Sequence, residues 1–226
     1  MCIFASTNNK NVMIMNKNEK FVIAINRELG SGGHTVGAKL AEKLGVKFYD
    51  KDVLKVLEDK FHLSIEEIER LKGQRHGWWA DVCRLMLVGQ DLGADLDMPK
   101  NYDGTGLLTA EDVFKAETEL LQNIAAEDSC VVSGRSGFYA LRNHPNHLSI
   151  LIQASMPFRV QRVMQKQNLT EEEARKVIDK VDEMRENYVK EYTKSSRYNS
   201  RNYDLVICAD GKTEDDIVAL ILKYIG

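Results

Sequence analysis

The sequence predicts an α/β domain built on a five-stranded parallel sheet that is sandwiched by helices. Two observations predict this fold class: five short apolar runs alternate with helical patterns, and a glycine-rich turn joins the first run directly to a helix. Strands buried on both faces of a parallel sheet read as short, nearly continuous apolar runs. The five runs are residues 21–26, 46–49, 130–133, 148–153 and 203–208. This alternation implies right-handed crossovers, with ligands bound at the carboxyl ends of the strands.

The helices between these runs have recognisable ends. Apolar residues with a period of about 3.6 follow the glycine-rich turn, and Gly45 is expected to end that helix. A second helix is expected to begin after Thr109 as its N-cap. A third is expected after the capping box that Thr170 forms with Glu173, and a last one near Thr213.

The composition is that of one globular domain. The chain has 226 residues, of which 43% are hydrophobic and 29% charged, and its net charge is −3. This length suits one substantial domain. The charge excludes the broad basic surface that a nucleic acid polymer or an anionic membrane requires. No apolar run approaches the roughly 20 residues that span a bilayer. The cysteines lie far apart and lack metal-binding spacing, which predicts a reducing, cytoplasmic location.

Two connections between the expected strands are too long to be plain crossovers. We expect residues 1–20 to form a flexible leader and residues 21–226 to form a single domain. Within that domain, the first long connection predicts a helical insertion at about 51–128, and the second predicts a helical lid at about 156–202. Both would stand at the ligand-binding edge of the sheet.

The glycine-rich turn has the composition of a phosphate-binding loop. Glycines let the backbone point several N–H groups inward, and the positive end of the following helix completes an anion site. The residues expected to bind a nucleotide are Gly30, Ser31, Gly32, Gly33, His34 and Thr35, and the Thr35 hydroxyl is the candidate ligand of Mg²⁺. A turn without any ligand is the alternative, and His34 is also open to interpretation as a solvated side chain.

The lysine of the usual pattern G-x-x-x-x-G-K-[ST] is missing. When Thr35 takes the hydroxyl position, the position directly before it, where the pattern has lysine, is occupied by His34. Phosphoryl transfer requires positive charge on the β- and γ-phosphate oxygens. Candidate replacements are Arg27, beside the loop, and arginines of the two insertions, because a guanidinium group binds phosphate bidentately and stays charged. Arg159 and Arg162 are three residues apart, so they share a helix face and can converge on one target.

Two further residues directly follow expected strands at the ligand edge. Arg135 lies in the turn after a buried strand, a position that favours ligand binding over a solvated surface. Asp50 follows the second strand, where it either positions the acceptor or a magnesium-bound water, or caps the helix that would begin at Lys51.

Five stretches of the chain resemble the cytidylate kinase-like family of P-loop proteins, which belongs to the nucleoside monophosphate kinases. They are RELGSGG at 27–33, FYDKDVL at 48–54, VVSGRSGFYAL at 131–141, ASMPFRVQRVM at 154–164 and DEMRENY at 182–188. The resemblance runs from about residue 21 to the C-terminus and is weakest at 61–108. It implies a P-loop NTPase-type sheet, a helical insertion that binds the monophosphate, a helical lid, and ATP with Mg²⁺ as cofactors.

The resemblance also implies roles for individual side chains. Arg185 corresponds to the lid arginine that embraces the transferring phosphate, and Arg162 acts with it; with Arg27 they are the expected catalytic residues. Arg135 corresponds to the arginine that grips the acceptor nucleotide, and Asp50 and Arg159 join it as expected substrate-binding residues. Ser133 and Ser136 stand where cytidylate kinases carry aspartates, a departure that leaves the acceptor open.

The combined prediction is an ATP-dependent phosphotransferase that acts on a nucleoside monophosphate, with CMP or dCMP as the first candidate. Its expected partners are small nucleotides, with no nucleic acid polymer and no membrane. Two alternatives remain: a kinase for a different small acceptor, and a non-catalytic sensor that binds a nucleotide.

Overall fold

The computed structural model describes residues 15–50, 110–134 and 136–226. Within these residues, the strands are β1 (Val22–Arg27), β2 (Lys47–Tyr49), β3 (Cys130–Ser133), β4 (His147–Gln153) and β5 (Leu205–Cys208). They form one parallel sheet in the order β2-β3-β1-β4-β5. The predicted α/β class with a five-stranded parallel sheet is confirmed, and the strand that carries the glycine loop is the central one.

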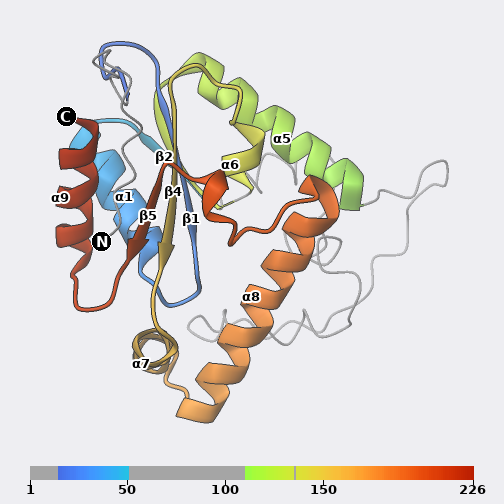
Figure 1. Ribbon diagram of the computed structural model, residues 1–226, viewed down its shortest axis with the longest axis vertical. Coiled ribbons are helices and arrows are strands. Elements are labelled where there is room, and N and C mark those ends of the chain that lie inside the picture. Colours follow the sequence, from blue (N-terminus) through green and yellow to red (C-terminus); the bar gives the residue numbers. More distant parts are fainter. Residues whose placement is uncertain (1–14, 51–109, 135) are drawn as a thin grey trace, which may run out of the picture.

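Helices cover both faces of this sheet, as the sequence predicted. They are α1 (Gly33–Leu44), α5 (Ala110–Glu127), the short α6 (Gly137–Ala140), α7 (Met156–Gln167), α8 (Glu171–Thr193) and α9 (Glu214–Ile225), with a 3-10 turn, η1, at Ser200–Asn202. Figure 1 shows α1 and α9 on one face and α5 with α6 on the other. No helix in the described ranges combines the length and the apolar character that crossing a membrane requires.

The alternation of side chains along β1 divides the core into two layers. Ile23 and Ile25 pack in one apolar cluster with residues of α1 and α9, whereas Val22 and Ala24 pack in a second cluster with residues of α5 and α6. Successive side chains of a strand point to opposite faces, so a strand buried on both faces must be apolar throughout. Of the predicted leader, residues 15–20 are described, and Met15 is buried in the first cluster.

The strand ends differ from the predicted ones by one or two residues. β1 continues through Arg27, so that side chain belongs to the strand end rather than to the loop. β5 begins at Leu205 rather than Tyr203. Asp204 contacts β4 twice: its backbone N–H donates to the Ser149 carbonyl at 2.9 Å, and its side chain Oδ2 accepts from the Ser149 N–H at 2.7 Å. The Tyr203 hydroxyl instead contacts Asn26 at the end of β1.

The predicted helix ends are confirmed wherever the structure describes them. Gly45 ends α1 with a left-handed φ of 67°. Thr170 and Glu173 form the predicted capping box at the start of α8, and Thr213 caps α9 with a second capping box. Thr109, predicted as the N-cap of the helix that is now α5, lies outside the described residues.

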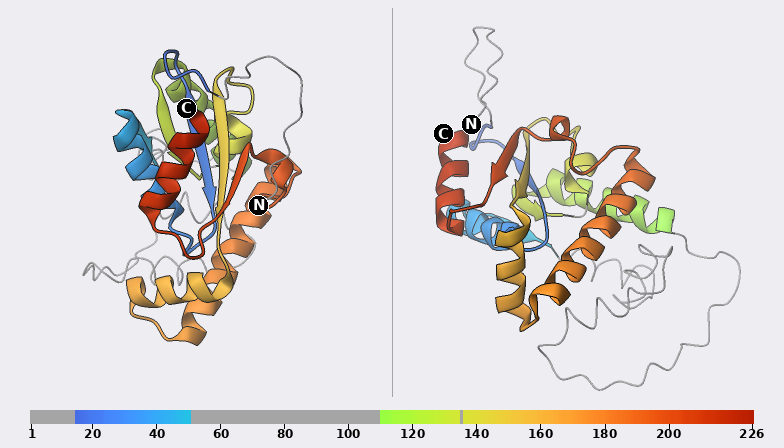
Figure 2. Two further views of the ribbon diagram at one scale, coloured as in Figure 1. Left: turned by 60° about the vertical axis from the view of Figure 1, so that its left-hand side comes forward. Right: turned by 60° about the horizontal axis from the view of Figure 1, so that its bottom comes forward.

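Helices α7 and α8 occupy most of the segment predicted to be a lid. α7 follows β4 after two residues, and it packs against α8 through Val160, Val163, Ala174 and Ile178. Figure 2 shows α7 and the start of α8 beyond the end of the sheet at which the glycine loop turns, while α8 runs back alongside the sheet. This segment therefore stands next to the loop, and its role as a lid stays a prediction.

Candidate functional site

The glycine loop turns between β1 and α1 in a shape that depends on its glycines. Gly30 and Gly32 have φ values of 85° and 84°, in the left-handed region that residues with a side chain avoid. A Cβ atom on Gly30 would lie 2.8 Å from the carbonyl oxygen of Arg159. The loop backbone therefore packs directly against α7, in a space where no side chain fits.

The amides at the start of α1 have no acceptor from a capping side chain. The N-cap residue is Gly32, which makes no side-chain cap, and the first turn contains no acidic residue. Helix N-termini leave their first N–H groups without intrahelical partners, so these groups are available to an anion. His34 and Thr35 are exposed on this turn. Ser31 is buried, and its hydroxyl donates to the Glu28 carbonyl at 3.0 Å, which stabilises the loop from inside.

Arg27, at the end of β1, forms an ion pair with Asp50. The distance from Arg27 Nη2 to Asp50 Oδ1 is 3.1 Å, and His34 Nε2 lies 3.1 Å from Asp50 Oδ2. Gly134, after β3, allows this arrangement, because a Cβ atom there would lie 1.9 Å from Arg27 Nη1. The structure thus brings three predicted site residues together: a catalytic candidate, a substrate-binding candidate and a loop residue.

Both predicted arginines of α7 lie against the glycine loop. Arg159 is buried, 7% exposed, and its guanidinium group is hydrogen-bonded to Asp182 and lies 3.7 Å from a Glu28 carboxylate oxygen. Arg162 lies farther along the loop, beside Gly32: its Nη2 atom is 3.2 Å from the position that a Cβ of Gly32 would occupy. They pair with different carboxylates, Arg159 with Asp182 and Arg162 with Glu214, so their convergence on one ligand stays a prediction.

Arg162 is held at the loop by Glu214, the first residue of α9. A short ion pair joins Arg162 Nη2 to Glu214 Oε1. Partial burial acts to raise the pKa of Glu214, but the hydrogen bonds from Arg162 and the backbone, together with the positive charges of Arg162 and Lys39, outweigh it, so the pKa lies below its ordinary value. Glu214 therefore stays ionised at neutral pH and keeps Arg162 beside Gly32.

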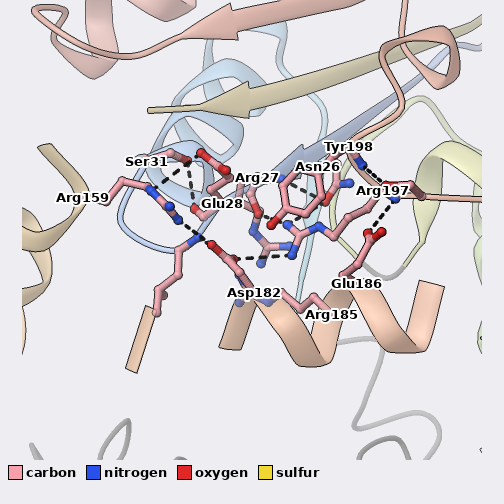
Figure 3. Close-up of polar contacts among 12 residues, drawn as sticks. Asn26, Arg27, Glu28, Ser31, Arg159, Asp182, Arg185, Glu186, Arg197 and Tyr198 are labelled. Carbon is pink, nitrogen blue, oxygen red and sulfur yellow. Dashed lines mark hydrogen bonds and ion pairs between the residues drawn. The ribbon is translucent and has the colours of Figure 1, made fainter. Parts of the chain in front are cut away.

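Arg185 of α8 shares a carboxylate with the buried arginines. Its Nη1 atom lies 4.0 Å from Asp182 Oδ1, and its side chain is one-third exposed. Figure 3 shows Asp182 between Arg159, Arg185 and Arg197. The structure thus brings Arg185, the expected lid arginine, into the charged cluster that contacts the glycine loop. Arg135 lies outside the described residues, and its predicted role stays a prediction.

Sequence reasoning missed Arg197. This side chain is only 1% exposed. It donates to the carbonyl oxygen of Arg27 and contacts Asp182 Oδ1 at 3.5 Å, while its own backbone N–H donates to Glu186 at 3.0 Å. The one available signal was weak: the segment 194–201 contains three cationic residues and no acidic one.

Two buried hydroxyls mark the carboxyl end of β3. Ser133 and Ser136 are 0% and 8% exposed, and within the described residues neither hydroxyl oxygen has a hydrogen-bond partner. Buried polar groups are normally paired. These two flank the turn that holds Gly134 against Arg27, so they lie at the edge where an acceptor is expected.

Comparison with known proteins places the chain in a wider context. A family model, that of the cytidylate kinase-like family, matches residues 22–210. Among solved structures, an uncharacterized protein from Eubacterium ventriosum is 26% identical, with a TM-score of 0.63; the match covers 91% of this chain and 98% of that one. A shikimate kinase from Acinetobacter baumannii in complex with shikimate is 17% identical, with a TM-score of 0.48, and the match covers 90% of this chain and 92% of that one. No curated protein matches the chain.

Proposed function

The chain belongs to the cytidylate kinase-like family, and from this premise we propose that it transfers the γ-phosphoryl group of ATP to a nucleoside monophosphate, with CMP or dCMP as the first acceptors to test. One observation carries the proposal: the uncapped first turn of α1 and the guanidinium group of Arg162 meet at Gly32. Backbone amides and a guanidinium group together supply the positive field that a loop lysine supplies elsewhere. The missing lysine is therefore compatible with phosphoryl transfer.

The donor binds at the glycine loop in this proposal. Amides of residues 30–35 bind the phosphates, as the left-handed Gly30 and Gly32 and the uncapped start of α1 support. Mg²⁺, when bound, neutralises charge on the β- and γ-phosphate oxygens. The Thr35 hydroxyl would hold it, which fits the exposed position of this residue in the first turn of α1.

Catalysis would rest on positioning and on charge neutralisation. Arg162 and Arg185 approach the loop from the two helices of the proposed lid, and Arg27 lies beneath it in its ion pair with Asp50. Each carries a permanent positive charge, so each can stabilise the negative charge that shifts onto the leaving oxygen. No covalent intermediate with the protein is required.

The acceptor would bind at the carboxyl ends of β2 and β3. The proposed contacts are Asp50, Arg135 and Arg159, together with residues of the insertion at about 51–128. A different small acceptor is the second candidate, and Ser133 and Ser136 favour it: they are neutral where cytidylate kinases carry aspartates, and their hydroxyls lack partners within the described residues. A cytoplasmic location belongs to the same proposal, and the free thiols of Cys130 and Cys208 support it.

Product analysis with a panel of acceptors tests the proposal. Purified protein with Mg-ATP is incubated with each nucleoside monophosphate and, in parallel, with nucleosides, sugars and other small hydroxyl compounds. CDP or dCDP formed from the matching monophosphate supports the first candidate, and product from another compound supports the second. If no acceptor consumes ATP above background while calorimetry still detects tight ATP binding, the protein is a nucleotide sensor and the kinase proposal is abandoned.

A further inference from the structure

Two charged side chains form hydrogen bonds with the backbone at the start of the glycine loop, one on each side of Glu28. The carbonyl oxygen of Arg27 accepts a hydrogen bond from Arg197 Nη2, and the N–H of Leu29 donates to Asp182 Oδ1 at 3.2 Å. The two side chains also contact each other, with 3.5 Å between Arg197 Nη1 and Asp182 Oδ1. Together they close a ring around the peptide groups that flank Glu28, which we call the loop strap.

The loop strap is buried and its charges are matched. Asp182 is 7% exposed and Arg197 1% exposed. A charge this deep is tolerated only when it is paired and hydrogen-bonded. Asp182 meets this condition by also binding Arg159 through its second carboxylate oxygen, and Arg197 by also contacting Asn26 Oδ1 at 3.4 Å. Figure 3 shows these contacts converging on the strap from several segments of the chain.

Both strap residues come from the segment proposed to be the lid. Asp182 lies in α8, and Arg197 lies in the return from α8 to β5. The backbone around Arg197 is anchored in turn, because its N–H donates to Glu186 of α8 at 3.0 Å and its carbonyl accepts from the Tyr203 hydroxyl at 2.6 Å. A shift of α8 would therefore be transmitted to the peptide groups of Arg27 and Leu29 directly, through these hydrogen bonds.

We propose that Asp182 and Arg197 are positioning residues, through which the lid helix α8 holds the glycine loop in its phosphate-binding shape. Asp182 Oδ1 accepts from the loop at Leu29 and lies 4.0 Å from Arg185 Nη1. The same oxygen atom therefore fixes the backbone of the loop that binds the donor phosphates and also the position of Arg185 before the lid closes. The phosphate-binding shape itself rests on the proposed function, whereas the mechanical link between α8 and the loop does not.

The test compares Asp182→Asn with Asp179→Asn in the full-length protein. Asparagine keeps an oxygen that can accept from Leu29, but it loses the charge that holds the arginines. Asp179 is exposed on the same helix, so its variant removes the same charge away from the strap. Leu121→Ala, in the core of α5, controls for lost stability alone, since Leu121 is 0% exposed. Arg197→Lys serves as the second strap variant because it keeps the charge and loses the planar guanidinium contacts.

Two measurements that do not need catalysis are made on each variant: hydrogen exchange of the amides at 27–31, and calorimetric binding of Mg-ATP and of inorganic tripolyphosphate. The strap variants are expected to exchange these amides faster and to bind both ligands about tenfold or more weakly. Where turnover is measurable, they are expected to lose on the order of 100-fold in kcat/KM, because a small displacement of the groups that position the substrate has an effect of this size. Asp179→Asn and Leu121→Ala are expected to match the wild-type protein in loop exchange and ligand affinity.

The outcomes separate the two proposals. Unchanged loop exchange and unchanged affinity in a folded strap variant overturn the loop strap, and so does an equal loss of affinity in Leu121→Ala at a similar drop in melting temperature. Faster loop exchange with weaker tripolyphosphate binding in the strap variants alone supports the strap, even if the wild-type protein phosphorylates no acceptor, a result that would reject only the proposed function. If Asp182→Asn does not fold, Arg197→Lys decides by the same criteria.

Discussion

At the scale of single residues, the site is arranged by ion pairs between side chains that are distant in the sequence. Arg27 pairs with Asp50, Arg159 with Asp182, and Arg162 with Glu214. The residue types were recognisable in the sequence, because arginines near a glycine-rich turn indicate phosphate chemistry. Their partners were not, because each pair depends on which strands and helices the fold brings together.

Gly134→Ala tests the contact between the turn after β3 and Arg27. The backbone at this position has a left-handed φ of 76°, and the new Cβ would lie 1.9 Å from Arg27 Nη1. We expect a loss of roughly 1–2 kcal/mol from the backbone conformation, together with displacement of Arg27 from Asp50. Denaturant unfolding measures the first effect, and the rate of ATP consumption with the identified acceptor measures the second.

Gly45→Ala is the matched control for this substitution. Its φ of 67° is also left-handed, but no atom lies within 4 Å of the added Cβ. The two variants are expected to lose similar stability, whereas only Gly134→Ala is expected to lose activity. Equal activity in both would show that the position of Arg27 does not matter to turnover.

At the scale of elements, the capping residues predicted the ends of the helices more accurately than the apolar runs predicted the ends of the strands. The capping box at Thr170 and the glycine that ends α1 were predicted and are confirmed, because both depend only on residues within one turn. The five strands were predicted to within two residues at each end. The largest difference is at the start of β5, where the Ser149 N–H of β4 donates to the Asp204 side chain, a tertiary contact that an apolar pattern does not contain.

Thr170→Ala tests how far the N-cap orders the first turn of α8. Loss of an N-cap hydroxyl costs about 1 kcal/mol, and the first turn of α8 is expected to fray. Hydrogen exchange of residues 171–176 should accelerate, because the Glu173 N–H loses its acceptor. Thr213→Ala removes an equivalent cap from α9 and serves as the control; faster exchange at 171–176 in that variant as well would mean that the effect is global.

At the scale of the whole molecule, topology assembles the site from segments that no local pattern connects. The central β1 supplies the glycine loop, α7 and α8 supply arginines, and the return to β5 supplies Arg197. Parallel crossovers predicted that ligands gather at one edge of the sheet. They did not predict the strand order, nor that an arginine in a short polar connection would be buried beneath the loop.

Several groups of the molecule have pKa values below their ordinary values, and two of them, one imidazole and one carboxyl group, act in separate pH ranges. Burial lowers the pKa of His147, at the start of β4, so the unfolded chain binds this proton first as the pH falls below about 6.5. Hydrogen bonds from Cys208 and Ser155 lower the pKa of Asp210 from 3.8 to about 2, so the stability that its carboxylate contributes is lost between about pH 4 and pH 2. Both effects have the same sign: the free energy of unfolding should decrease in two stages as the solution is acidified.

Urea unfolding at pH 7, 6 and 5, compared with His147→Gln, isolates the first stage. The wild-type protein is expected to lose stability across this interval, with a slope that the variant reduces, because glutamine cannot bind the proton. Asp210→Asn leaves this interval unchanged and alters only the stage below pH 4, since its carboxylate is already ionised above that pH in both states. Parallel curves for the wild-type protein and His147→Gln between pH 7 and 5 would show that the buried imidazole does not limit stability, and that the first protons taken up on unfolding bind elsewhere.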